Sequence, residues 1–268
     1  MSPFTVIEGD GPIVLGMPHI GTWLPDDLTA RLNARGRGLD DTDWHIARLY
    51  DGVLPGATIV ASTVHRYAID ANRDPAGVSL YPGQNTTALC PVTDFDGKPI
   101  WEAGQEPGED EILARREAFH APYHAALLAA VERARARHGV AVLWDCHSIR
   151  SDIPFLFEGT LPVYNIGTND GVTCAPGITT AVQAACLASG DSTVLNGRFK
   201  GGWSTRHYGQ PETGVHAIQM ETAQRAYLAA EAAPWAYDTD RAAKARKVFA
   251  AALGMIDRLA RSGALAPR

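Results

Sequence analysis

Short apolar runs alternate with amphipathic stretches along most of this chain. The apolar runs have the length of strands, and several are rich in β-branched residues, as is typical of strands buried in a sheet. We expect strands at 11–17, 57–64, 140–145, 163–168, 193–197 and 214–222. The intervening stretches have helical spacing, and we expect helices at 25–35, 42–51, 110–139, 176–188 and 238–262.

Two irregular segments and one proline interrupt this pattern. Residues 75–108 are rich in Gly, Pro, Thr and Asp and are expected to form a long loop, a kind of segment that is often functional. Residues 196–214 form a second Gly-rich stretch that could close over a ligand. Pro122 lies inside the helical pattern of 110–139 and is expected to kink or split that helix.

The alternation of strands and helices predicts the fold class. Strands that alternate with helices form a mainly parallel sheet with helices on both faces. No linker-like segment divides the chain, so we expect one three-layer α/β domain over residues 1–268, with a mainly parallel or mixed central sheet. Ligands of such sheets bind at the carboxyl ends of the strands.

Composition narrows the function classes. The chain is 46% hydrophobic and 20% charged, as in an ordinary globular protein, and its net charge of -6 argues against a nucleic-acid partner. We expect neither a secretion signal nor a membrane span, and hence a cytoplasmic protein that acts on a small molecule as a monomer or small homo-oligomer. The cysteines are expected to be reduced: Cys90, Cys146, Cys174 and Cys186.

Chemically useful side chains follow three of the predicted strands. His19 follows the first strand, Asp145 and His147 follow the run that ends at Trp144, and Glu221 stands near the end of the last strand. Two histidines and one carboxylate are the ligands of many catalytic zinc sites, which keep a fourth position for water. A separate carboxylate can take the proton of that water, and Glu221 is available for this role.

The acidic ligand has two candidates, Asp43 and Asp51, both in the expected helix 42–51. An ordinary explanation also exists, because a single histidine at a strand end is more often a surface or hydrogen-bonded residue. Two histidines and a glutamate at strand ends are harder to explain in that way.

Residues 65–75 and 196–214 supply cationic groups. An arginine can bind both oxygens of a carboxylate, and it can stabilise an oxyanion on an attacked carbonyl. A solvated loop with ordinary ion pairs is the alternative for 65–75. The two segments contain Arg66, Asp70, Asn72 and Arg73, and Arg198, Lys200, Arg206 and His207.

Two other patterns are not interpreted as sites. His120 and His124 have the spacing of two zinc ligands on a helix, but Pro122 separates them and the glutamate of the HExxH motif is absent. We therefore expect helix-surface histidines. Ser148 lacks the glycine frame of a nucleophile elbow.

Several segments in a fixed order carry a family resemblance. They are "MPHIGTWLP", "DTDWHIARLYD", "HRYAIDANRDP", "LYPGQNTTALCPVTDFDGKPIW", "DCHSIRSDIPFLFEG", "NGRFKGGWSTRHYG" and "GVHAIQMETAQRAYL". From about residue 12 to residue 230 the chain resembles the N-formylglutamate deformylase (N-formylglutamate amidohydrolase) family. The resemblance implies a fold related to the zinc-dependent exopeptidases (phosphorylase/hydrolase-like). It also implies hydrolysis of N-formyl-L-glutamate to formate and L-glutamate in histidine degradation.

The resemblance also implies a metal centre. His19 and His147 match the two histidine ligands of the exopeptidases, and Asp43 is carried over as the acidic ligand. The compact HxxE arrangement of those enzymes is missing, because Thr22 stands at its last position. Zinc is the expected metal, although iron, cobalt or manganese could occupy the same ligands.

Roles for the remaining site residues come from the same resemblance. Glu221 corresponds to the general base and Arg66 to the arginine that polarises the carbonyl, while Asn72 and Arg73 correspond to the pair that binds a substrate carboxylate. Asp145 is expected to orient a ligand. A dicarboxylate needs a second cationic contact, for which the candidates are Arg150, Arg206 and His207.

Two other functions remain open at this point. One is a related deacylase or carboxypeptidase-like hydrolase of another N-acyl amino acid. The other is a non-catalytic binding protein with the same fold, against which the presence of Glu221 beside both histidines argues.

Overall fold

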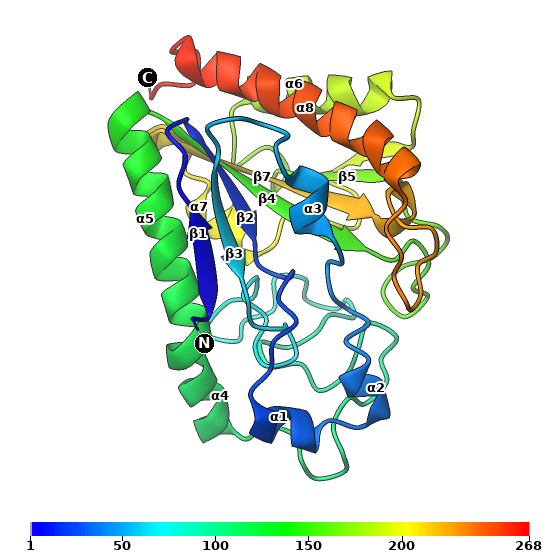
Figure 1. The fold of residues 1–268 in the computed structure, drawn as a ribbon. Coiled ribbons are helices and arrows are strands. Elements are labelled where there is room, and N and C mark those ends of the chain that lie inside the picture. The colour runs from blue at the N-terminus through cyan, green and yellow to red at the C-terminus, as the bar shows by residue number, and fades with distance from the viewer. Residues whose placement is uncertain (1, 268) are drawn as a thin grey trace.

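A mixed β-sheet with helices on both faces forms the centre of the molecule (Figure 1). The computed structural model describes residues 2–267, and within them the sheet has seven strands in the order β1-β3-β2-β4-β7-β5-β6. The strands are β1 (Phe4–Ile7), β2 (Ile13–Met17), β3 (Thr58–Ser62), β4 (Ala141–Ile149), β5 (Tyr164–Gly167), β6 (Thr193–Leu195) and β7 (Val215–Ala223).

The central strands are parallel. β2 pairs in parallel with β3 and β4, and β4 pairs in parallel with β7. The antiparallel pairs are β1 with β3 and β5 with β7. The predicted three-layer α/β fold with a mainly parallel or mixed sheet is therefore confirmed.

The helices divide between the two faces of the sheet. One face packs against α3, α6 and α8, and the other packs against α5 and α7. Within residues 2–267, none of the helices is both long enough and apolar enough to span a bilayer. The helical segments are α1 (Asp26–Arg31), α2 (Ala34–Arg37), α3 (Ile46–Tyr50), α4 (Glu109–Arg115), a π-helical turn (Arg116–His120), α5 (Ala121–His138), α6 (Pro176–Ala188), α7 (Trp203–Tyr208), two 3₁₀ turns (Pro211–Thr213 and Gln224–Ala226) and α8 (Thr239–Arg261).

Side-chain alternation along β4 determines what reaches the site. Trp144 and Cys146 belong to the apolar cluster under α8, whereas Leu143 packs in the cluster under α5. Successive side chains of a strand point to opposite faces, so Asp145 and His147 share the face of Leu143. This polar pair therefore points away from Cys146.

The helix predicted at 25–35 is wrong in its length, because two short helices stand there. Leu32 adopts an extended conformation and is fully buried, and Asn33 caps α2 by accepting a hydrogen bond from the Gly36 N–H (2.9 Å). The side chain of Asn33 accepts this bond while its backbone is extended, which ends the first helix and begins the second at this point.

The helix predicted at 42–51 is also shorter than expected. It begins only at Ile46, and Asp43 lies in the preceding turn, where its N–H donates to the carbonyl of His19 (3.0 Å). This hydrogen bond attaches the turn to the segment just after β2. Asp43 therefore lies next to His19 and before the helix, not on it.

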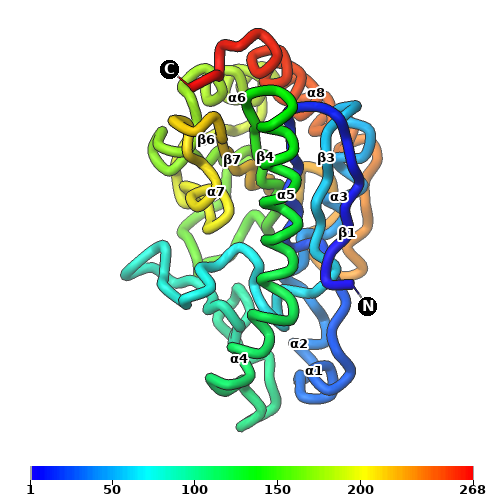
Figure 2. Tube along the Cα trace, turned by 90° about the vertical axis from the view of Figure 1, so that its left-hand side faces the viewer, coloured from blue at the N-terminus to red at the C-terminus, as the bar shows by residue number. Residues whose placement is uncertain are grey.

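Some elements extend or add to the prediction. β4 continues to Ile149, β1 adds an antiparallel edge strand, and α7 forms inside the stretch predicted as a loop. The interruption expected at Pro122 is confirmed. A π-helical turn precedes α5, and the two segments with α4 form the long rod seen in Figure 2.

Residues 63–108 contain no helix or regular strand in the structure. They lie with α1 and α2 beyond the carboxyl ends of β2 and β3, in the lower part of Figures 1 and 2. This segment therefore covers the edge of the sheet at which ligands of parallel sheets bind.

Candidate metal and substrate site

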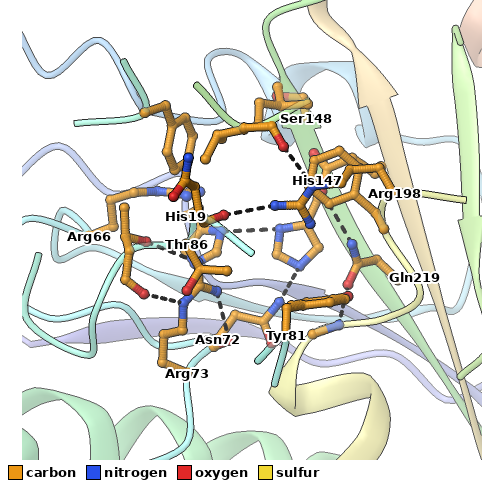
Figure 3. A pocket seen from close by; sticks show the side chains of 18 residues that line it. His19, Arg66, Asn72, Arg73, Tyr81, Thr86, His147, Ser148, Arg198 and Gln219 are labelled. Carbon is orange, nitrogen blue, oxygen red and sulfur yellow. Dashed lines mark hydrogen bonds between the residues drawn. The ribbon is translucent and has the colours of Figure 1, made fainter. Parts of the chain in front are cut away.

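A cavity lies at the carboxyl ends of β2, β4 and β7 (Figure 3). Its walls come from these strands, from the long segment after β3 and from the segment before α7. Its lining residues are His19, Arg66, Asn72, Arg73, Tyr81, Asn85, Thr86, Thr87, Phe95, His147, Ser148, Ile149, Leu156, Arg198, Phe199, Gly202, Gln219 and Glu221.

Three side chains at the base of the cavity form a group that can hold a metal ion: His19, Asp43 and His147. The Nδ1 atoms of the two histidines are 3.1 Å apart, and Asp43 Oδ2 lies 3.3 Å from His147 Nδ1 and 3.8 Å from His19 Nδ1. Tetrahedral zinc with bonds of about 2.0–2.2 Å holds its ligand atoms roughly 3.3–3.6 Å apart. The three separations lie on both sides of this range, so small side-chain shifts would let the donors hold such an ion, and His19 and His147 also line the cavity.

The carboxylate of Asp43 is fixed by two donors. Arg66 Nη2 donates to its Oδ1 (2.9 Å), and the backbone N–H of Ser148 donates to its Oδ2 (3.2 Å). The other acidic candidate, Asp51, lies at the end of α3, where its carbonyl accepts from Arg246 (2.6 Å). The structure therefore groups Asp43, and not Asp51, with the histidines.

Each of the two histidines has a carboxylate next to its Nε2, the ring nitrogen that points away from the other donor atoms of the group. Asp70 Oδ1 lies 2.6 Å from His19 Nε2, and Asp145 Oδ1 lies 3.0 Å from His147 Nε2. An Nε2–H that bonds a carboxylate leaves Nδ1 unprotonated and oriented, which is the arrangement that metal-binding histidines require. The expectation that Asp145 supports a ligand matches this geometry.

Burial and charge act differently on the two rings. Burial, reinforced by the nearby charge of Arg66, lowers the pKa of His19 to about 4, so this ring is neutral at pH 7. Burial also disfavours the charged form of His147, but the carboxylates around the ring, Asp145 foremost and then Asp43 and Glu221, together outweigh it and raise the pKa of His147 well above its ordinary value. A metal that binds at His147 must therefore displace a proton.

Glu221 is the neighbour of His147 in the parallel register of β4 and β7. Its carboxylate accepts from Gln219 Nε2 (3.2 Å) and lines the cavity. Burial raises the pKa of Glu221 to about 8, with the positive charge of His147 opposing this shift and Asp43 adding to it. A carboxyl group in this range can both accept and return a proton near neutral pH.

Arg66 and Arg73 line the same cavity. Arg66 stands over the ring of Phe95, 4.9 Å from its centroid, and its buried Nε has no hydrogen-bond partner in residues 2–267. Arg73 donates from Nε to the carbonyl of Thr87 (3.0 Å) and lies 3.6 Å from Asp70 Oδ2. Both arginines are thus held by the protein at the cavity wall.

Asn72 is used mainly within the protein. Its Oδ1 accepts from the N–H of Ser204 (2.8 Å), and its Nδ2 lies 2.9 Å from His147 Nε2. The side chain therefore connects the start of α7 to His147, although it also lines the cavity.

The three candidates for a second carboxylate contact do not line the cavity. Arg150 lies just past β4 and donates to Asp96 (3.1 Å). Arg206 donates to the carbonyl of Gly201 (2.9 Å), and His207 stacks on Trp203 on another surface. Arg206 and His207 both belong to α7, and Arg206 also donates to the carbonyl of Leu80 (3.3 Å).

Some contributions were missed by the sequence interpretation. Asp70 and Gln219 hold His19 and Glu221, respectively. No spacing pattern identifies them, although the position of Gln219 two residues before Glu221 places both on one face of β7. His120 and His124 are buried, not on the helix surface as expected. The Nε2 of each donates to a backbone carbonyl, that of Arg73 and that of Ala71, respectively, and His124 Nδ1 lies 3.1 Å from the Tyr208 hydroxyl.

Comparison with known proteins assigns the chain to a family. A sequence model of the family described as N-formylglutamate amidohydrolase matches residues 11–228. A curated N-formylglutamate deformylase from Pseudomonas aeruginosa is 46% identical over 244 residues, which are 90% of this chain and 91% of the relative. One from Pseudomonas putida is 44% identical over 237 residues, 88% of each chain.

Solved structures agree with this assignment. The crystal structure of N-formylglutamate amidohydrolase from Ralstonia eutropha JMP134 has a TM-score of 0.82 at 26% identity and covers 98% of this chain and 100% of its own. A gene product from Agrobacterium tumefaciens, at 19% identity, shares the fold with a TM-score of 0.71 over 96% of each chain. This chain belongs to the N-formylglutamate amidohydrolase family.

Proposed function

We propose that this protein hydrolyses the formyl amide of N-formyl-L-glutamate to formate and L-glutamate, with zinc or another divalent transition metal bound by His19, Asp43 and His147. The observation that carries the proposal is the meeting of this ligand group with Glu221 and Arg66 in one cavity. The curated relatives named N-formylglutamate deformylase support the choice of substrate.

The bound metal supplies a Lewis acid and lowers the pKa of water at this position. Glu221 accepts the proton of the attacking water on its carboxylate. It then donates that proton to the amide nitrogen as the bond to the formyl carbon breaks, so that the amine leaves in neutral form. Burial raises the pKa of Glu221 above that of an ordinary carboxyl group, and a bound divalent cation would lower it toward the range in which the group can both take up and return a proton near neutral pH.

Arg66 stabilises the negative charge that develops on the formyl oxygen. Its guanidinium is tied to Asp43 by one nitrogen only, so other N–H groups are available to the substrate. Because the side chain is buried and positioned before the reaction, little reorganisation is needed when the charge forms.

Arg73 binds one carboxylate of the substrate. Its hydrogen bonds to Thr87 fix the guanidinium at the wall, and it is one-quarter exposed, which leaves room for a ligand. A guanidinium can meet a carboxylate through two parallel hydrogen bonds. We place the reaction in histidine degradation, as the family resemblance implies, and in the cytoplasm, as expected from the sequence.

A direct test combines metal analysis with product analysis. The purified protein is expected to contain about one equivalent of a divalent transition metal and to release formate from N-formyl-L-glutamate. Chelation should abolish this activity, and zinc should restore it. Faster release of acid from N-acetyl or other N-acyl amino acids would instead assign a different deacylase, and a metal-containing protein without any turnover would contradict the proposal.

A further inference from the structure

One arginine of the cavity forms no ion pair with an acidic side chain in the part of the chain that the structure describes. Three arginines line it within the described residues, and Arg66 and Arg73 each lie near a carboxylate, at 2.9 Å and 3.6 Å, respectively. Arg198 forms no ion pair with any residue of 2–267. A partly buried arginine without a counter-ion at a cavity wall has an energetic reason to accept an anion.

The guanidinium of Arg198 is held in place by neutral groups. Its Nε donates to the carbonyl of Leu156 (2.9 Å) and its Nη2 to the carbonyl of Asn85 (2.9 Å). The group also lies over the rings of Tyr81 and Phe199, at 5.4 Å and 5.2 Å from their centroids. Its Nη1 makes no hydrogen bond to residues 2–267, so this end of a rigid fork remains available.

The electrostatic environment agrees with an anion site. Burial, together with the positive charge of Arg73, lowers the pKa of Arg198 below its ordinary value. Two guanidinium groups that repel each other around one cavity are both stabilised by a ligand with two negative charges. Figure 3 shows Arg73 and Arg198 among the side chains around the paired histidine rings.

We propose that Arg198 binds the side-chain carboxylate of the substrate and thereby selects an acidic side chain, while Arg73 binds the α-carboxylate. This inference rests on the proposed function. The α-carboxylate is attached to the carbon that bears the reacting amide, so it must lie near the metal ligands. Arg73 adjoins Asp70, the partner of His19, whereas Arg198 is held by the more peripheral Asn85 and Leu156.

The cavity also offers a path for the substrate's methylene groups. Apolar side chains line it between the polar groups, among them Phe95, Ile149, Leu156 and Phe199. The length of the substrate's side chain therefore decides whether its terminal carboxylate can reach the guanidinium of Arg198.

The test compares N-formyl-L-glutamate with N-formyl-L-glutamine, which has the same shape without the side-chain charge. In the Arg198→Gln variant, kcat/KM for N-formyl-L-glutamate should fall roughly 10- to 100-fold, because a charge-assisted contact is lost. The value for N-formyl-L-glutamine should change little. An equal loss for both substrates would assign Arg198 to the α-carboxylate and overturn the proposal.

A matched control variant tests whether the loss of any arginine that bonds backbone carbonyls would change the substrate preference in the same way. Arg246 also donates to backbone carbonyls, those of Leu49 (2.8 Å) and Asp51 (2.6 Å), and lies outside the cavity. Arg246→Gln should leave the preference for glutamate unchanged. If Arg198→Gln does not fold, Arg198→Lys keeps the charge but loses the planar fork, and it should still reduce the preference roughly tenfold. An unchanged preference in whichever variant folds contradicts the inference.

Binding distinguishes failure of this inference from failure of the proposed function. By calorimetry, the metal-containing wild type should bind L-glutamate more tightly than L-glutamine, and Arg198→Gln should remove most of the difference. If the difference is present but no formate is released, the proposed function fails and the assignment of Arg198 stands. If formate is released but glutamate has no binding or kinetic advantage over glutamine, the assignment fails.

Discussion

Asp70 Oδ1 lies 2.6 Å from Nε2 of His19, and both side chains are buried. The same Asp70 oxygen accepts from the N–H of Asn72 (2.8 Å), so the carboxylate is held from two directions. Several positive neighbours, Arg73 foremost, overcome the cost of burial and lower the pKa of Asp70 well below its ordinary value. Asp70 therefore carries a negative charge that orients His19 without reaching the metal position.

Replacement of Asp70 by Asn should weaken metal binding without removing a ligand. Loss of a carboxylate behind a metal-binding histidine typically costs roughly 10–100-fold in metal affinity. Competition of the purified variant with a zinc-binding dye measures this change directly. The control is Asp152→Asn, an exposed position beside Thr160, which should retain wild-type affinity. Equal affinities for zinc in the two variants would remove the orienting role of Asp70.

Replacement of Glu221 by Gln should separate chemistry from binding. Glu221 is outside the group of donor atoms around the metal position, so the variant should keep its metal. Its turnover of N-formyl-L-glutamate should fall by roughly 10²–10⁴-fold, because an amide cannot accept the proton of water. Metal content and kcat measured on one preparation, with the exposed Glu212→Gln as control, check both parts. Near-normal turnover would exclude Glu221 as the general base.

Replacement of Arg73 by Gln should affect all N-formyl amino acids in a similar way. If Arg73 binds the α-carboxylate, kcat/KM should fall roughly 10–100-fold for both N-formyl-L-glutamate and N-formyl-L-glutamine. This result differs from that expected for Arg198, for which the loss is confined to the acidic substrate. Since Arg73 also bonds Thr87, the unfolding temperature must be compared with that of the wild type. A loss only with the acidic substrate would exchange the two roles.

The sequence predicts the base of the site better than its walls. His147 and Glu221 end up side by side because both stand near the carboxyl ends of parallel strands that are neighbours in the sheet. Strand periodicity carries this information, and the same rule places His19. The rule that site residues follow the carboxyl ends of strands works less well for Arg150. β4 continues to Ile149, and Arg150, just after it, donates to Asp96 (3.1 Å) instead of lining the cavity.

The cavity walls depend on contacts that no local pattern encodes. Arg198 reaches the cavity because the carbonyls of Asn85 and Leu156, far away in the chain, fix its guanidinium. Asp70 and His19 are likewise joined across irregular segments. Loop paths follow from packing in three dimensions. The sequence therefore places the cationic groups in the right segments without identifying which of them line the cavity.

His124 links the stability of the protein to pH. Its Nε2 bonds the carbonyl of Ala71 (2.7 Å) and its Nδ1 bonds the hydroxyl of Tyr208 (3.1 Å), an arrangement that suits the neutral ring. Burial, with the charge of His120 adding to it, lowers the pKa of His124 to about 3. The folded state therefore binds fewer protons here than the unfolded state, whose histidine has an ordinary pKa near 6.5.

The sign of the effect follows from this difference. Above pH 6.5 both states are neutral at His124 and stability does not depend on it. As the pH falls from about 6.5 toward 3, the unfolded state gains a proton and the folded state does not, which destabilises the protein by up to about 1.4 kcal/mol per pH unit. In His124→Gln the free energy of unfolding, measured by urea titration between pH 4 and pH 7, should depend less steeply on pH by up to this amount. His120 and His207, whose pKa values burial also lowers, should account for part of the remaining slope. Identical slopes in the variant and the wild type would mean that His124 is protonated in the folded state as readily as in the unfolded one.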